Sequence, residues 1–277
     1  MPTVRSGGLR PPANEPHEYR QAAQSFGSDA ERYDRTRPRY PEALVERIVS
    51  ASPGPDVLDV GCGTGIAARQ FQAAGCAVLG VDPDARMART ARRLGTEVEV
   101  ATVEAWDPAG RAFDAVVAAQ SWHWVDPVAG AATVGRALRP GGRFAAFWNV
   151  FRLPAEVARA SAGALRRVMP DSPFDFEAMT RQAVDLYRPM LAKAADGLRE
   201  VGGFDEPEEW VFTWEWHYTR DAWLDMMPTQ GALTRLSAEA LAPVLEEVGA
   251  AIDTLGGGFT MPYTTVAVTA PRSASAA

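Results

Sequence analysis

A glycine-rich turn that follows a short apolar run is the first segment whose residues could hold a cofactor. The run Val57–Val60 has the pattern of a buried strand, and Gly61, Gly63 and Gly65 follow it, ahead of helix-forming residues. Glycines let a ligand approach the backbone closely, and free N–H groups at a helix start attract negative charge. Asp82 lies 21 residues after Gly61, close to the spacing of a carboxylate that binds ribose hydroxyls. Together these residues predict a site for a nucleotide-like cofactor.

Two cofactor classes share this arrangement, and two residues distinguish them. A dinucleotide fingerprint has glycine at the sixth position of the turn, where this chain has Ile66. Asp59 lies two residues before Gly61. Its charge would repel a pyrophosphate and attract a ligand that carries ammonium and sulfonium groups. We therefore expect S-adenosylmethionine, which has both groups, and regard NAD as the disfavoured alternative.

The segment SWHWVDP supplies the candidate catalytic residue. It follows another strand-like run, and doubly wound sheets bind ligands outside the carboxyl ends of their strands. His123 is the candidate, either as a general base or as a group that orients the substrate. The alternative is a structural, neutral imidazole hydrogen-bonded between its two tryptophan neighbours. Trp122, Trp124 and Trp148 lie at predicted strand ends, which predicts that they line a substrate pocket.

The composition limits the classes of partner. The chain has 277 residues, of which 47% are hydrophobic, and a net charge of −7. An acidic surface repels phosphate backbones, so we expect a small-molecule substrate and no nucleic-acid partner. Cys62 and Cys76 are the only cysteines, which indicates a reducing, cytoplasmic location. No apolar run is long enough to span a membrane, no Cys or His spacing suits a metal, and nothing indicates the oligomeric state.

The order of predicted elements indicates the fold class. Between residues 56 and 150, β-rich runs alternate with helix-patterned stretches, which predicts an α/β fold whose parallel sheet has helices on both faces. A later aromatic run, EEWVFTWEWHYT, alternates at period two and predicts a strand with a buried aromatic face. A helix over 237–255 separates it from the last strand, which suggests an antiparallel addition at the sheet edge. The predicted strands are Val57–Val60, Ala77–Val81, Val98–Thr102, Phe113–Ala119, Arg143–Val150, Glu208–Thr219 and Met261–Thr269.

The same pattern divides the chain into five parts. We expect a mobile tail, a helical cap joined to the cofactor-binding core, a helical lid inserted after the fifth strand, the C-terminal part of the core, and a short tail. Their bounds are 1–24, 25–150, 151–203, 204–270 and 271–277.

Several of these runs together resemble a known family. The segments YDRTRPRYP, VLDVGCGTG, GVDPD, SWHWVD, LRPGG and FWN occur in this order, and the chain from about residue 25 to 270 resembles the class I S-adenosylmethionine-dependent methyltransferases. Within them it is similar to a small-molecule branch related to trans-aconitate methyltransferases and to natural-product methyltransferases. The resemblance implies a doubly wound, Rossmann-like sheet of seven strands, with an N-terminal helical cap and a helical insert after the fifth strand.

The resemblance also implies roles for individual residues. The turn would contact the methionine part of the cofactor, Asp82 the ribose, and residues 102–104 the adenine, although the family's usual Asp near position 102 is Thr102 here. The cofactor-binding set is Tyr33, Arg37, Asp59, Gly61, Cys62, Gly63, Gly65, Asp82, Pro83, Met87, Val103, Glu104, Gln120 and Ser121. The implied activity is methyl transfer to an oxygen, nitrogen or carbon atom of a hydrophobic or aromatic small molecule, such as an indole. Carboxylate O-methylation of a small organic acid, and a cofactor-binding protein that catalyses another reaction, are the alternatives.

Overall fold

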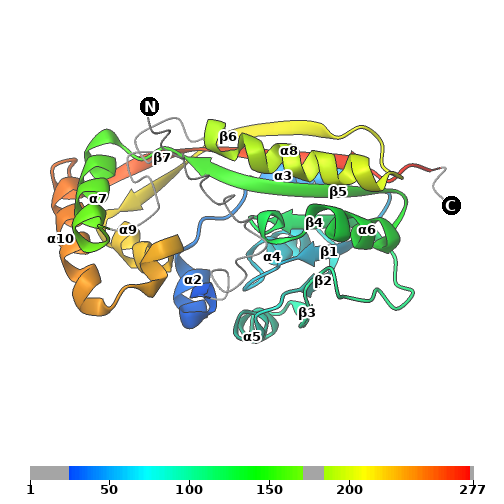
Figure 1. The fold of residues 1–277 in the computed structure, drawn as a ribbon, viewed down its shortest axis with the longest axis horizontal. Helices are drawn as coiled ribbons and strands as arrows, with labels where there is room; N and C mark the ends of the chain where they lie inside the picture. The colour runs from blue at the N-terminus through cyan, green and yellow to red at the C-terminus, as the bar shows by residue number, and fades with distance from the viewer. Residues whose placement is uncertain (1–24, 171–183, 275–277) are drawn as a thin grey trace, which may run out of the picture.

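A seven-stranded sheet with the order β3-β2-β1-β4-β5-β7-β6 forms the centre of the molecule (Figure 1). The computed structural model describes residues 25–170 and 184–274. Strands β1 to β5 pair in parallel, and β7 pairs antiparallel with both of its neighbours, β5 and β6, so β7 alone runs against the other six. The predicted α/β class, the doubly wound sheet and the late antiparallel addition are therefore confirmed. The strands are β1 (Asp56–Val60), β2 (Ala77–Val81), β3 (Glu97–Glu99), β4 (Phe113–Ala119), β5 (Leu138–Phe151), β6 (Glu208–Thr219) and β7 (Gly258–Pro271).

Helices cover both faces of the sheet, because the central strands are apolar on both sides. On one face, α3 (Glu42–Ser50) and α4 (Ile66–Ala73) pack against the sheet around Phe147. On the other face, α6 (Pro127–Ala137) and α8 (Val184–Val201) pack around Phe144 and Trp148. Side chains alternate along β5, so neighbouring residues such as Phe147 and Trp148 belong to opposite cores. Each core is buried, which fixes the register of β5.

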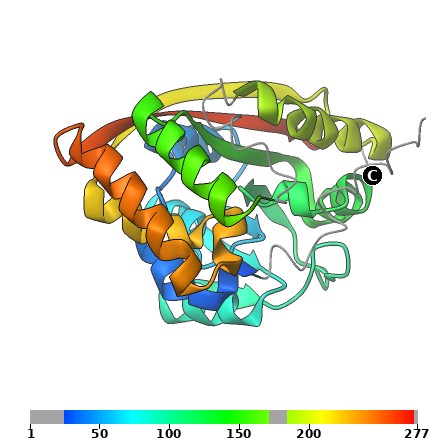
Figure 2. The same cartoon turned by 60° about the vertical axis from the view of Figure 1, so that its left-hand side comes forward.

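A third group of helices packs against the far ends of β6 and β7. The group has α7 (Ala155–Val168), α9 (Arg220–Met226) and α10 (Ala238–Asp253), and it encloses a core around Trp223 and Tyr263. Figure 2 shows α7 and α10 lying side by side. The predicted lid over 151–203 is divided: α7 belongs to this group, whereas α8 lies on the sheet. Residues 171–183 of that predicted lid, and the tail predicted at 1–24, lie outside the described residues.

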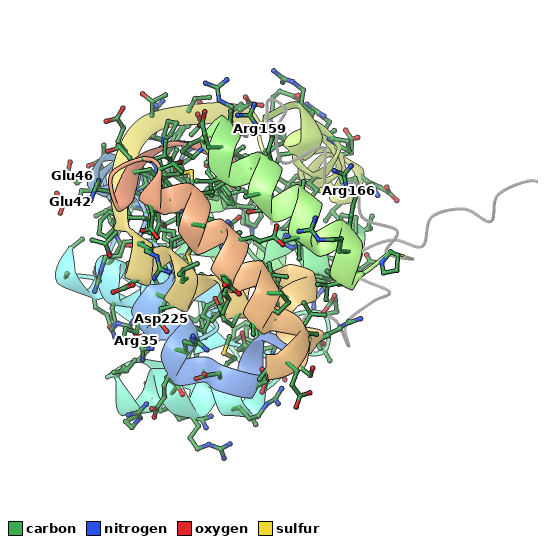
Figure 3. The ribbon with its side chains drawn as sticks, turned by 90° about the vertical axis from the view of Figure 1, so that its left-hand side faces the viewer. Arg35, Glu42, Glu46, Arg159, Arg166 and Asp225 are labelled. Carbon is green, nitrogen blue, oxygen red and sulfur yellow. The ribbon has the colours of Figure 1, made fainter. Side chains whose placement is uncertain are left out.

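The N-terminal cap consists of η2 (Ser25–Asp29) and α2 (Ala30–Thr36). Ion pairs join α2 to elements far along the chain. Arg35 points toward Asp225 of α9 (Figure 3), and their charged atoms lie 2.8 Å apart. On the other side, Asp34 pairs with Arg69 of α4 at 2.7 Å. Helix α2 therefore bridges the cofactor-binding half of the sheet and the helical group.

Strands β5 and β7 extend a few residues beyond their predicted bounds, and two other strand predictions differ from the structure for physical reasons. Strand β3 ends at Glu99 rather than at Thr102, because its one neighbour, β2, ends at the paired residue Val81. On β6, Trp210 and Tyr218 are buried as predicted, but Trp216 is 44% exposed. Strand β6 is the edge of the sheet, and its aromatic face is covered at its two ends only.

Candidate cofactor and substrate site

A cavity of about 380 Å³ opens at the carboxyl ends of the central parallel strands. This is the edge at which doubly wound sheets bind ligands. Its walls come from the glycine turn, from the loops after β2, β3 and β4, from α2 and from α8, α9 and β7. The predicted site residues that line it are Tyr33, Arg37, Gly61, Gly63, Asp82, Pro83, Met87, Val103, Glu104, Gln120, Ser121, His123, Trp124 and Trp148.

The glycine turn gives the cavity its floor. Gly61, Gly63 and Gly65 have φ values of +64°, +56° and +83°, a region that side chains strongly disfavour. A Cβ at Gly61 would lie 2.5 Å from Cβ of Ser121, so this glycine is needed for packing. A Cβ at Gly63 would meet only Met87, at 3.9 Å, and would project into open space. Gly63 is therefore the position where backbone is exposed to a ligand.

Asp82 links the floor of the cavity to the next strand. Its carboxylate accepts hydrogen bonds of 2.8 Å from the backbone N–H of Gly63 and of Asp84. The side chain is 7% exposed, and burial raises its pKa to about 6 despite these two donors. A carboxylate can accept more than two hydrogen bonds, so Asp82 retains lone pairs for hydroxyl donors of a ligand.

Of the predicted cofactor-binding residues, Asp59, Cys62 and Gly65 do not line the cavity. The Asp59 carboxylate is fully buried and makes no hydrogen bond of good geometry in the described part of the chain. Burial and then the nearby charge of Asp82 raise its pKa to about 8, and the Ala68 N–H opposes this only in part. Burial therefore favours the protonated form of Asp59, and its carboxyl has no direct access to a ligand in the cavity. Cys62 packs with Val98 in a small core instead.

The loops after β3 and β4 form the sides of the cofactor half. Val103 and Glu104 line the cavity, and an oxygen of Glu104 accepts the backbone N–H of Asp126 at 3.0 Å. Gln120 has a φ of +56°, which is unusual for a residue with a side chain and typical of functional sites. The hydroxyl of Ser121 donates to the carbonyl of Val60 at 2.5 Å and so ties the β4 loop to the turn.

Of the three predicted pocket tryptophans, two line the cavity. Trp124 and Trp148 contribute to its wall, but Trp122 is 2% exposed and packs edge-on against Phe144 in the core. The three residues 122–124 form a short 3₁₀ helix, in which successive side chains point in different directions. This explains why neighbours in the sequence face different surroundings.

The substrate half of the cavity also contains residues that the sequence did not single out. Most belong to segments far apart in the chain and have aromatic or thioether side chains. No local sequence pattern marked them as pocket residues. They are Tyr40, Asn149, Phe151, Tyr187, Met190, Met226, Gln230 and Tyr263. Tyr263 donates to or accepts from the hydroxyl of Tyr218 at 2.7 Å, which fixes its ring against the helical group.

Arg37 is the one cation among the described residues that line the cavity. Its guanidinium stacks over the ring of Tyr33 at 4.6 Å and donates to the carbonyl of Thr229 at 2.5 Å. No carboxylate pairs with it in the described part of the chain, and its Nε is buried without a hydrogen-bond partner. This leaves a charged donor available to an anionic group.

The cofactor half fits S-adenosylmethionine by the chemistry of its residues. The exposed backbone at Gly63 leaves room for the ligand, Asp82 offers acceptors for ribose hydroxyls, and Met87 and Val103 offer an apolar surface for a base. Among residues 25–170 and 184–274, no three His, Cys, Asp or Glu side chains converge as a metal site. The absence of a metal requirement stays a prediction. Within the same ranges, no helix combines the length and apolar character needed to cross a bilayer.

Comparisons with known proteins agree with this geometry. A family model described as a methyltransferase domain matches residues 58–146. The chain is 37% identical over 138 residues to an uncharacterized methyltransferase of Mycobacterium tuberculosis, a match that covers 47% of this chain. The match covers 54% of that relative, so the chain spans about half the length of these mycobacterial relatives.

Two further matches cover a larger share of the matched protein. The ubiquinone biosynthesis O-methyltransferase of Rhizobium etli is 30% identical over 182 residues, which cover 62% of this chain and 71% of that protein. The solved structure of a candidate type II methyltransferase from Anaeromyxobacter dehalogenans is 27% identical with a TM-score of 0.62, covering 86% of this chain and 98% of the other. The chain thus belongs to the class I S-adenosylmethionine-dependent methyltransferases.

Proposed function

We propose that the protein transfers the methyl group of S-adenosylmethionine to an oxygen, nitrogen or carbon atom of a hydrophobic or aromatic small molecule. One observation carries the proposal: a single cavity has the glycine turn and Asp82 at one end and an aromatic wall at the other. When bound, S-adenosylmethionine supplies an electrophilic methyl group on a sulfonium sulfur. The protein's part is to hold an acceptor beside it and to exclude water, which accounts for much of the rate of such reactions.

The lining of the substrate half supports an apolar, planar acceptor. Trp148, Phe151, Met190 and Met226 supply ring faces and thioethers, and the stacked pair Trp214–Tyr263, with ring centroids 4.4 Å apart, stiffens the wall behind them. Aromatic surfaces of this kind bind flat apolar ligands. An indole or another heteroaromatic compound fits this description. A role in natural-product metabolism is part of the proposal and is supported by the sequence resemblance described above.

A turnover assay tests the proposed reaction. The protein is incubated with S-adenosylmethionine and with indoles, phenols and aromatic carboxylic acids, and the release of S-adenosylhomocysteine is followed with the mass of the acceptor. We expect S-adenosylhomocysteine to form together with an acceptor heavier by one methylene unit. Saturable binding of S-adenosylmethionine with no release for any class would instead indicate a protein of this fold with another activity, because fold alone does not decide the reaction.

A second candidate function is O-methylation of a carboxylic acid, which the unpaired guanidinium of Arg37 favours. Arginine recognises carboxylates through paired hydrogen bonds. If Arg37 binds an acid substrate, Arg37→Gln should raise the KM for aromatic acids by about tenfold or more, since a charged hydrogen bond contributes about 1.5–3 kcal/mol. The KM for indoles and phenols should change little.

The same variant shows whether Arg37 binds the cofactor, as the sequence predicts, or the acid substrate. A carboxylate is also present on the methionine part of S-adenosylmethionine, so calorimetry with S-adenosylmethionine alone is the control. A loss of cofactor affinity in Arg37→Gln, with equal effects on all acceptors, would assign the guanidinium to the cofactor and remove the support for an acid substrate.

A further inference from the structure

The indole of Trp148 fixes which nitrogen of His123 carries a proton. Trp148 Nε1 lies 3.2 Å from His123 Nδ1. An indole N–H can only donate a hydrogen bond, so Nδ1 must be the acceptor and carry no hydrogen. In a neutral imidazole, the proton then resides on Nε2. Trp148 borders the cavity and is packed into the core that forms this wall, with almost no exposed surface, so this donor is held in place.

The surroundings of His123 keep its ring neutral. Burial lowers its pKa to about 4, and no neighbouring charge contributes to this shift. Two of the charged groups that line the same cavity, Asp82 and Asp84, belong to the cofactor half. The titratable groups that line it are Tyr33, Arg37, Tyr40, Asp82, Asp84, Glu104, Tyr187 and Tyr263.

The second ring nitrogen of His123 is free for a ligand. In the described part of the chain, the one hydrogen bond of His123 is the contact with Trp148. Nε2 is not among the buried nitrogen atoms that lack a partner, so it is accessible. Since His123 lines the cavity, Nε2–H is the hydrogen-bond donor that its ring can offer to a ligand there.

We propose that His123 donates a hydrogen bond from Nε2–H to the acceptor molecule, and that Trp148 is the positioning residue that holds the imidazole in this tautomer. In this geometry the neutral imidazole has no free lone pair for a general base, because Nδ1 accepts from Trp148 and Nε2 carries the proton. This inference rests on the proposed methyl transfer. It specifies an acceptor that presents an oxygen or a pyridine-type ring-nitrogen lone pair to Nε2–H, which phenols and aromatic acids have and an unsubstituted indole lacks.

No tyrosine of the substrate half replaces His123 as a base. Burial raises the pKa of Tyr40, Tyr187 and Tyr263 above the ordinary value, so their hydroxyls are protonated at neutral pH. An acceptor such as a carboxylate therefore reacts in the ionised form in which it binds. An acceptor that must lose a proton releases it to water.

Nitrogen-15 NMR of the ligand-free protein tests the tautomer without any turnover. Two-bond ¹H–¹⁵N correlations distinguish a protonated Nε2 from a protonated Nδ1, and the His123→Gln and His217→Gln variants assign the signals. We expect His123 to be protonated at Nε2 and to remain neutral down to about pH 5. In Trp148→Phe, which lacks the donor, a mixture of tautomers is expected. A proton on Nδ1 in the unsubstituted protein, or an unchanged tautomer in a folded Trp148→Phe protein, would overturn the proposal.

Turnover of two isosteric variants separates a donor from a base. The Gln amide reaches about as far as Nε2 and can donate, whereas Glu at the same position can only accept once it is ionised. Because burial raises carboxyl pKa values in this protein, to about 8 for Asp59, turnover is compared at about pH 9, where the Glu is ionised. With S-adenosylmethionine saturating and an aromatic acid or phenol that the turnover assay shows to be methylated, His123→Gln should retain kcat within about threefold. His123→Glu should lose about tenfold, the effect of one lost hydrogen bond. His217→Gln, at an exposed position of β6 outside the cavity, is the matched control. A higher kcat for His123→Glu than for His123→Gln would show that His123 acts as a base. Absence of turnover in the unsubstituted protein would count against methyl transfer, and the NMR result alone would then decide the tautomer.

Discussion

Gly63→Val is expected to abolish S-adenosylmethionine binding while the protein stays folded. A Cβ at this position points into open cavity space, with only Met87 within 4 Å, so the two γ-methyl groups of valine would occupy the volume of the ligand. The backbone N–H of Gly63 also donates to Asp82, and strain at this residue would disturb that contact. We expect the dissociation constant in isothermal calorimetry to rise by more than about 100-fold, equivalent to more than about 2.7 kcal/mol.

Gly95→Val is the matched control for backbone strain. Gly95 has a φ of +94°, and a Cβ added there would have no atom within 4 Å. This glycine lies in the exposed turn before β3 and does not line the cavity. A side chain in this left-handed region costs about 1–2 kcal/mol, so both variants should melt at a lower temperature than the unsubstituted protein. Only Gly63→Val should lose the ligand, and binding within threefold of normal in folded Gly63→Val would show that the cofactor does not approach this turn.

The cofactor half was predictable from the sequence because its residues are close together in the chain. The run from Val57 to Gly65 forms one strand and one turn, and the apolar pattern of β2 and β4 gives their observed bounds. Asp82 reaches Gly63 because parallel pairing of β1 and β2 aligns their carboxyl ends. Local pattern and the rules of parallel sheets were sufficient here.

Asp59 shows where proximity in the sequence misleads. It precedes Gly61 by two residues, but it lies within β1, where successive side chains point to opposite faces of the sheet. Its carboxylate faces the start of α4, near the Ala68 N–H, rather than the cavity. A carboxylate inside a buried strand correctly suggested a special role for Asp59. The sequence did not show on which side of the sheet its side chain would lie.

The substrate half could not be predicted, because it is assembled by tertiary packing. Tyr187 comes from α8, Met226 from the end of α9, and Tyr263 from β7. Within its own segment, each of these side chains is of a type that is common in protein cores. The His123–Trp148 hydrogen bond likewise depends on how β5 lies beside the β4 loop. These contacts decide the chemistry of the pocket, and they appear only once the chain is folded.

Asp82→Ala is expected to weaken S-adenosylmethionine binding by about 1.5–3 kcal/mol, the contribution of hydrogen bonds to a charged group, or roughly 10- to 150-fold. The variant loses the acceptor for ribose hydroxyls and also the contact that orders Gly63. Asp107→Ala is the matched control, since it removes one exposed carboxylate outside the cavity and changes the net charge equally. An effect of the same size in both variants would mean that long-range charge, rather than contact, explains the loss.

The raised pKa of Asp82 adds a dependence on pH whose sign can be worked out. Without ligand the pKa is about 6, above the ordinary 3.8, mainly because of burial. Hydroxyl donors and a cationic ligand favour the ionised carboxylate, so protons compete with the cofactor below pH 6. Affinity should therefore be about tenfold lower at pH 5 than at pH 7.5, since a group of pKa 6 is about nine-tenths protonated at pH 5. In Asp82→Asn, which has no proton to lose, this part of the pH dependence should vanish.

Stability of the ligand-free protein should follow the opposite trend. A carboxyl whose pKa is raised by folding binds its proton more tightly in the native state than in the unfolded chain. The free energy of unfolding should therefore fall as the pH rises from about 4, through Asp82 up to about pH 6 and through Asp59 up to about pH 8. In thermal denaturation, Asp82→Asn should make the decline below pH 6 less steep and leave the decline from pH 6 to 8 unchanged. Saturating cofactor favours ionised Asp82. The increase in melting temperature that the cofactor causes should therefore grow between pH 5 and 7 in the unsubstituted protein and stay constant in Asp82→Asn. An equal growth in both proteins would assign the titration to another group.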